Sequence, residues 1–287
     1  MTYRLGCPVF GARSWVGEIL PARTSPRDQL TEYARLFSAV EGNGTFYGLP
    51  KADAALRWAE DTPEHFRFAF KLPKEVSHGD LEPRSKVVTS FLEVLAPLGV
   101  RLGPSMLQLP PWFDFGGLRK LHRFLALWPQ DRLLSVELRH PDWFDEGRKE
   151  RDLHRLLADH GAERVCLDSR ALFSASAPDA STAAAQGRKP QVPVRFVGLG
   201  EAPVVRIIGR NDAAECVEVL SSWAKVVSRW LREDRAPLVF CHTPDEHYAP
   251  QLARAFHDAL RLSVPELEPL PPWPLPSRHQ GPQLELL

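Results

Sequence analysis

The chain has 287 residues, of which 44% are hydrophobic and 25% are charged, as expected for a globular domain in water. Its 36 basic and 36 acidic side chains cancel, so the composition gives no overall attraction to nucleic acid or to an anionic membrane surface. No apolar run approaches the roughly 18 residues of a membrane-spanning helix, and the first residues lack a signal-peptide pattern. We therefore expect no membrane partner, a cytoplasmic location and four reduced cysteines.

Eight short segments have the composition of buried β-strands. They are expected over residues 3–8, 39–43, 66–71, 104–111, 133–140, 164–168, 203–208 and 236–242. Helical periodicity is expected between most of them, in segments that begin near residues 25, 53, 85, 117, 153, 213 and 249. Ser25 is predicted to cap the first helix, with Pro26 in its first turn.

The strand segments are mostly apolar on both faces, which is typical of a parallel sheet covered by helices. Eight βα units favour a single α/β domain folded as a TIM-type (β/α)8 barrel over an open, doubly wound sheet. No glycine-rich phosphate-binding pattern follows the first strand, which weakens the dinucleotide-binding alternative. The barrel is expected over residues 1–262, followed by a proline-rich tail over residues 263–287.

One segment interrupts the alternation of strands and helices. Residues 174–190, after the sixth strand, are small, polar and flanked by prolines. A long loop is predicted here, on the face of the barrel where the strands end. It is interpreted either as a surface insertion or as a mobile lid over a site.

Polar side chains follow or end seven of the predicted strands, whereas the strands themselves are apolar. In chain order these side chains are Glu41, Asn43, Lys71, Gln108, Glu137, Arg139, Asp168, Arg206 and His242. Burying so many charged groups is costly unless they are paired or functional. Because the carboxyl ends of barrel strands form the usual site of TIM-barrel enzymes, we expect them to line one pocket.

The residue types suggest roles in that pocket. The catalytic candidates are Glu41, Lys71, Glu137 and Asp168, with Glu137 or Glu41 as a general base and Asp168 orienting or sharing the proton. The substrate-binding candidates are Asn43, Tyr47, Gln108, Arg139, Arg206 and His242. The two arginines, together with Lys71, are suited to gripping a phosphate or carboxylate. The alternative is purely structural: ion pairs Lys71–Glu41 and Arg139–Asp168 would fill the top of the barrel.

Other chemistries have weaker signals. Of ten histidines, four lie near loops on the expected active face, but no HxH or HExxH motif is present. We therefore predict no cofactor, and leave a divalent metal open. Cys166 is considered as a nucleophile on the assumption that it points inward. Nucleic acid is weakly supported by loop aromatics near basic residues, namely Trp15, Tyr47, Trp112 and Trp143.

Several of the segments that carry these residues resemble the motifs of one protein family. The segments Val40-Glu41-Gly42-Asn43, Phe66-Arg67-Phe68-Ala69-Phe70-Lys71 and Val136-Glu137-Leu138-Arg139-His140 are similar to motifs of the YecE-like family, also called domain of unknown function 72. Further similar segments are Thr45-Phe46-Tyr47, Leu49-Pro50, Leu107-Gln108-Leu109-Pro110-Pro111, Leu167-Asp168-Ser169-Arg170, Arg206-Ile207-Ile208-Gly209 and His242-Thr243-Pro244-Asp245. They follow the family's order from residue 1 to about residue 262.

The resemblance implies a TIM-type barrel and names no reaction. Many members carry an Asn-Asn pair after strand eight, where this chain has Cys241-His242-Thr243. Some other proteins with this barrel act on sugars or abasic DNA through metal ions, an analogy of fold alone. We expect a hydrolase- or lyase-like enzyme acting on a small anionic or sugar-phosphate molecule. The alternative is a non-catalytic module that binds phosphate-bearing ligands or nucleic acid. The sequence does not indicate an oligomeric state.

Overall fold

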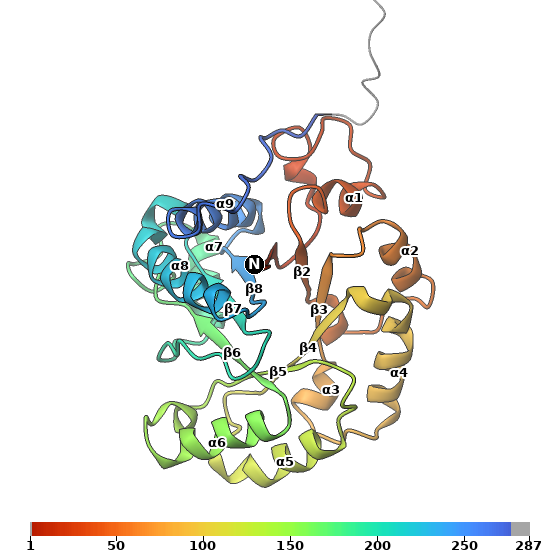
Figure 1. The fold of residues 1–287 in the computed structure, drawn as a ribbon, viewed down its shortest axis with the longest axis vertical. Helices are drawn as coiled ribbons and strands as arrows, with labels where there is room; N and C mark the ends of the chain where they lie inside the picture. The colour runs from red at the N-terminus through yellow and green to blue at the C-terminus, as the bar shows by residue number, and fades with distance from the viewer. Residues whose placement is uncertain (1, 277–287) are drawn as a thin grey trace, which may run out of the picture.

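Eight parallel strands close into a barrel in chain order, with β8 pairing back onto β1. The computed structural model describes residues 2–276 (Figure 1). The strands are β1 (Arg4–Cys7), β2 (Ala39–Gly42), β3 (Arg67–Lys71), β4 (Leu102–Gln108), β5 (Leu134–Glu137), β6 (Glu163–Asp168), β7 (Val204–Ile208) and β8 (Leu238–His242). The predicted (β/α)8 barrel is thus confirmed, and the open-sheet alternative is wrong.

The helices surround the barrel as a ring (Figure 1). They are α1 (Gln29–Tyr33), α2 (Ala54–Glu60), α3 (Lys74–Ser77), α4 (Lys86–Leu95), α5 (Leu118–Leu127), α6 (Arg148–Asp159), α7 (Ala180–Arg188), α8 (Val217–Arg232) and α9 (Ala249–Arg261). The predicted cap at Ser25 is wrong, because Ser25 and Pro26 belong to a turn before α1. Within this turn the Ser25 hydroxyl donates to the Asp28 carboxylate at 2.6 Å and accepts from the Asp28 amide at 3.3 Å.

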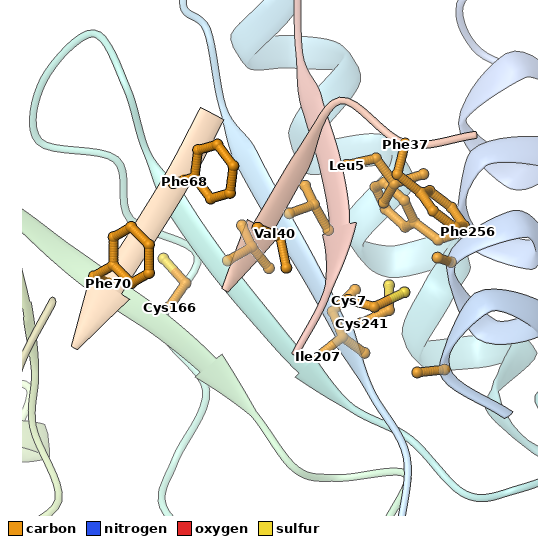
Figure 2. Packing of buried hydrophobic residues seen from close by; sticks show 14 of the residues in the cluster. Leu5, Cys7, Phe37, Val40, Phe68, Phe70, Cys166, Ile207, Cys241 and Phe256 are labelled. Carbon is orange, nitrogen blue, oxygen red and sulfur yellow. The ribbon is translucent and has the colours of Figure 1, made fainter. Parts of the chain in front are cut away.

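Alternation along the strands produces two apolar layers. One set of side chains, including Val40, Phe70 and Cys241, points outward and packs against the helices. Figure 2 shows part of this outer layer, with Cys7 and Cys241 close to Phe256 of α9. A separate, smaller cluster lies inside the barrel and consists of Ala39, Ala69, Met106, Val165, Val204, Leu238 and Phe240. Its members show which residues point inward in six of the strands, namely β2, β3, β4, β6, β7 and β8.

Gly6 marks the tightest approach between two strands. A Cβ atom there would lie 2.0 Å from the Ala39 carbonyl oxygen, which belongs to the paired strand β2. Backbone cannot move aside as a flexible side chain can, so we expect Gly6→Ala to lower the free energy of unfolding by about 2 kcal/mol. Gly187→Ala is the matched control, because nothing lies within 4 Å of its added Cβ. Urea unfolding of both variants would test this; equal stability would contradict the close contact.

The segment 174–190 contains the helix α7, where the sequence predicted only a loop. Ala185 of α7 belongs to one buried apolar cluster with Leu167 and Ile208, the last inward side chains of β6 and β7. The start of the segment is also fixed, since the Arg210 guanidinium donates to the Ala175 and Ser176 carbonyls. The segment therefore packs over the ends of β6 and β7, and its interpretation as a surface insertion or as a mobile lid stays a prediction.

The residues that follow α9 run back across the molecule toward the region around α1 (Figure 1). The Leu275 amide donates to the Ile19 carbonyl at 3.1 Å, and the Arg254 guanidinium lies 4.0 Å from the centre of the Trp273 ring. This part of the predicted tail thus packs on the barrel. Its final part, residues 277–287, lies outside the described residues.

Candidate functional site

A polar layer lies above the inner apolar cluster, at the carboxyl ends of the strands. Side chains two residues apart in a strand point to the same face, so the residues after the apolar cluster also point inward. In five strands these next side chains are polar, namely Glu41, Lys71, Gln108, Arg206 and His242. Strand β5 adds Glu137, which is paired in register with Gln108. The structure therefore brings together most of the predicted site residues.

Arg206 stands at the centre of the cluster, fully buried between two carboxylates. Its Nε and Nη2 donate to the two oxygens of Glu41 at 2.7 and 2.8 Å, and its Nη1 donates to Glu137. His242 Nε2 lies 2.9 Å from Glu41 Oε2. The sequence suggested that Arg206 binds a ligand. Because its guanidinium already donates to a carboxylate on each side, the geometry instead suits Arg206 to holding Glu41 and Glu137 in place.

Two cations lie at the upper, more accessible edge of the cluster. Arg139 donates through Nε and Nη2 to Glu137 Oε1 at 2.8 and 2.6 Å, and its side chain remains 15% exposed. Lys71 Nζ lies 3.8 Å from Glu41 Oε1, with 11% of the side chain exposed. The Thr45 hydroxyl fixes the end of β3 by donating to the Lys71 carbonyl at 2.7 Å. A ligand entering the mouth would reach these two cations first.

The surrounding cations keep both buried carboxylates ionised. Burial alone would raise the pKa of Glu41, but Arg206, His242 and Lys71 hold that pKa well below its usual value. Burial would also raise the pKa of Glu137, but Arg206, Arg139 and Lys71 lower it to about 2. Carboxylates held so firmly are poor proton acceptors at neutral pH. This argues against the predicted general-base role of Glu41 and Glu137.

The pKa values of Lys71 and His242 are also lowered, which for these basic groups favours the neutral form. Burial and the neighbouring Arg206 lower the pKa of Lys71 to about 7, although Glu41 and Glu137 oppose this. Burial lowers the pKa of His242 to about 4, against the attraction of Glu41. At neutral pH, Lys71 is therefore the group of this cluster best matched to taking up and releasing a proton.

Sequence reasoning missed Lys189, which follows α7. Burial and Arg206 lower its pKa to about 8, while Glu41 and Glu137 raise it, so the amine belongs to the same electrostatic environment. Lys189 forms no ion pair within 4.0 Å with any residue of the described chain. Its only signal in the sequence was its place in the segment after strand six, because a lysine in a polar loop is otherwise unremarkable.

The cluster holds more positive than negative charge. Glu41 and Glu137 give two negative charges, whereas Arg206, Arg139, Lys71 and Lys189 give four positive charges when both lysines are protonated. Glu246, on the exposed loop after β8, reduces this excess from two to one. Gln108 Oε1 and Ser135 Oγ are buried without a hydrogen-bond partner within residues 2–276. Among the described residues, the site thus has a cation without an ion pair, Lys189, that can bind an anion, and an acceptor, Gln108 Oε1, that can bind a hydrogen-bond donor of the same ligand.

The rim beside β2 and β3 is open and aromatic. A hollow of about 420 Å³ has Glu41 and Asn43 in its wall, and the Asn43 amide donates to the Pro8 carbonyl at 3.1 Å. Tyr47 and Trp112 are 85% and 69% exposed. The His78 ring contacts two aromatic rings here, with its centre 5.3 Å from that of Phe46 and 5.5 Å from that of Trp112. Trp15 and Trp143 are buried, so their predicted contact with nucleic acid is wrong.

Asp168, a predicted catalytic residue, and Cys166, considered as a nucleophile, point away from the barrel interior. Asp168 points to the helical layer, where it accepts hydrogen bonds from Trp223 Nε1 of α8 at 2.9 Å and from Arg170 at 2.8 Å. Its catalytic assignment, and its pairing with Arg139, are wrong. Cys166 also belongs to the outer layer (Figure 2), and burial raises its pKa to about 12. The inward orientation assumed for a Cys166 nucleophile is therefore wrong.

Within residues 2–276, no group of three or more His, Cys, Asp or Glu side chains is arranged to hold a metal ion. In the same range, no helix is both long enough and apolar enough to span a membrane.

Comparisons with known proteins agree with this architecture. The family described as "Protein of unknown function DUF72" matches residues 4–277. The chain belongs to this family. It is 39% identical to the UPF0759 protein YecE of Escherichia coli K12 over 246 residues, which is 85% of this chain and 90% of that protein. It is 25% identical to the UPF0759 protein YunF of Bacillus subtilis over 159 residues, covering 52% of this chain and 55% of that one.

Solved structures of the DUF72 family share the fold. A member from Enterococcus faecalis superposes with a TM-score of 0.69 at 18% identity, covering 96% of this chain and 100% of that one. A member from Thermotoga maritima gives a TM-score of 0.66 at 20% identity, covering 93% and 100%. Family membership establishes the barrel and leaves the chemistry to be argued from the site.

Proposed function

We propose that this DUF72 protein is an enzyme, hydrolase- or lyase-like, that binds a small anionic or sugar-phosphate substrate at the carboxyl ends of its barrel strands. The observation that carries the proposal is the unbalanced cluster inside the barrel mouth. When Lys71 is protonated its cations outnumber its carboxylates by one, and within residues 2–276 Lys189 has no carboxylate partner within 4.0 Å. A phosphate or carboxylate would complete the arrangement without leaving a buried charge unpaired.

The roles follow from position within the cluster. Arg139 and Lys189 are placed to bind the anionic group, and Gln108 to accept a hydrogen bond from a neutral group of the substrate. Glu41 and Glu137 hold the cations in place. Lys71 performs the proton transfer, because its pKa of about 7 allows both protonation states at neutral pH.

A second candidate is a non-catalytic module for phosphate-bearing ligands, including nucleic acid. The specific observation in its favour is the exposure of Tyr47 and Trp112 beside the mouth, since exposed aromatic rings can stack on bases. Against it, Arg206, Arg139 and Lys71 lie inside the barrel and next to carboxylates. Such cations do not form the continuous basic surface that tracks a nucleic-acid backbone.

The Arg139→Ala variant tests anion binding. We expect ribose 5-phosphate to stabilise the unaltered protein in a thermal-shift titration, and the variant to bind it about tenfold more weakly because one charge-assisted contact is lost. Arg148→Ala is the matched control, since Arg148 is 85% exposed on α6. Equal binding by the Arg139 variant would contradict the proposal. Tight oligonucleotide binding that weakens steeply with salt would favour the second candidate instead.

A further inference from the structure

Lys71 is the amine most rigidly placed in the cluster. It ends β3, where the following amide, of Leu72, donates to the Met106 carbonyl at 3.0 Å, and Thr45 holds its own carbonyl. A group on a strand so tied at both sides keeps its position better than one on a loop. Lys189, by comparison, follows the short helix α7.

We propose that Lys71 is a covalent nucleophile, whose Nζ forms an imine with the aldehyde or ketone carbon of the anionic substrate. This rests on the proposed function, because it needs the anionic end held by Arg139 and Lys189. It deepens that function by naming the substrate class, a small anionic carbonyl compound, and by favouring a lyase-like over a hydrolase-like reaction.

The surroundings of Lys71 meet the needs of such a nucleophile. An amine attacks only when neutral, and enzymes favour the neutral form by burying the lysine and placing other cations near it. Lys71 is buried, and Arg206 and Arg139 both act on it electrostatically. Its pKa of about 7 agrees with this environment. The groups that oppose the neutral form are Glu41 and Glu137.

The covalent step needs no further reagent. The Nζ lone pair forms a bond to the carbonyl carbon, the π electrons of C=O move to oxygen, and the proton lost by nitrogen is taken up by that oxygen. The resulting carbinolamine takes up one proton and loses water, which leaves a protonated imine. Atoms and charges therefore balance as amine, carbonyl compound and one proton giving iminium and water.

The protonated imine formed in this step suits the same cluster of side chains. The iminium carries one positive charge close to where Nζ stood, 3.8 Å from Glu41 Oε1 in the free protein. The ring of Phe46, whose centre is 5.9 Å from Nζ, offers a second, weaker attraction for a cation. Glu41 therefore stabilises the intermediate as an ionised carboxylate, which explains why a group with such a low pKa belongs in the site.

Reductive trapping tests the inference on the full chain. The protein would be incubated separately with pyruvate, glyceraldehyde 3-phosphate and dihydroxyacetone phosphate, reduced with sodium borohydride, digested and analysed by mass spectrometry. We expect one saturable adduct on Lys71, at least tenfold more abundant than on any other lysine, and suppressed by excess inorganic phosphate. Its rate of formation should rise between pH 6 and pH 8.

Two variants make the result specific. Lys71→Met should abolish the adduct, whereas Lys74→Met should retain it, because Lys74 lies exposed three residues away. Thermal-shift binding of ribose 5-phosphate separates the two proposals. Binding without a Lys71 adduct would overturn the imine and leave the proposed function standing. Scattered labelling of surface lysines, with no binding, would overturn both.

Discussion

Replacing Arg206 with methionine should lower the free energy of unfolding by about 3–5 kcal/mol at pH 7. The substitution leaves Glu41 and Glu137 buried without the guanidinium that bonds to both, and an uncompensated buried charge is among the most destabilising changes known. Urea unfolding with the stability read at pH 7 measures the effect. Arg57→Met is the matched control, since Arg57 pairs with Asp53 on the surface and should cost less than about 1 kcal/mol.

The pH dependence of this variant separates charge from packing. In the unaltered protein both carboxyl pKa values lie below the usual 4.5, so their stabilisation is present above that pH and is lost as the pH falls toward 2. Without Arg206 both pKa values should rise, and protonation then relieves the buried charge. The difference between variant and parent should therefore shrink as the pH falls below about 5. If the loss in free energy of unfolding does not change with pH, the Arg206→Met variant is destabilised by lost packing and not by unpaired charge.

Lys71→Met should have the opposite effect and make the protein more stable. The pKa of Lys71 falls from 10.5 to about 7 on folding, so burying this side chain disfavours its charged form. Methionine removes that penalty, and we expect a gain on the order of 3 kcal/mol in the free energy of unfolding near pH 7.

The lowered pKa of Lys71 also makes the stability gain of Lys71→Met depend on pH. The penalty from Lys71 is fully present below pH 7 and disappears as the pH rises toward 10.5, so the advantage of the variant should fade over that range. Differential scanning calorimetry at pH 6.5 and pH 9.5 checks this. Lys74→Met is the exposed control and should leave the stability within about 0.5 kcal/mol of the parent. A destabilised Lys71→Met protein would show that its pairing with Glu41 outweighs the cost of burial.

The sequence predicted the inward-pointing site residues wherever a polar side chain followed an apolar strand. Glu41, Lys71, Gln108, Arg206 and His242 each stand two residues after an apolar inward position, so period-2 alternation was enough to predict their convergence. The pairing of Arg139 with Glu137 follows from the same face of one short segment.

In strand β6 the same alternation led to a wrong prediction of which side chains point inward. Val165 and Cys166 are adjacent and both apolar, so the pattern does not reveal which face looks inward. The last inward residue is Leu167, which made the neighbouring Asp168 an outward one. Lys189 could not be found because it lies outside the strands, where spacing carries no information about direction.

The apolar cluster of Ala185 with Leu167 and Ile208 has a consequence for how molecules reach the barrel centre. It covers the ends of β6 and β7 with hydrocarbon, whereas Tyr47, which follows β2, is 85% exposed. The same segment carries Lys189, whose amine shares the electrostatic environment of Glu41, Glu137 and Arg206. A change in the length of residues 174–190 would therefore alter access to the barrel and the charge of the cluster together.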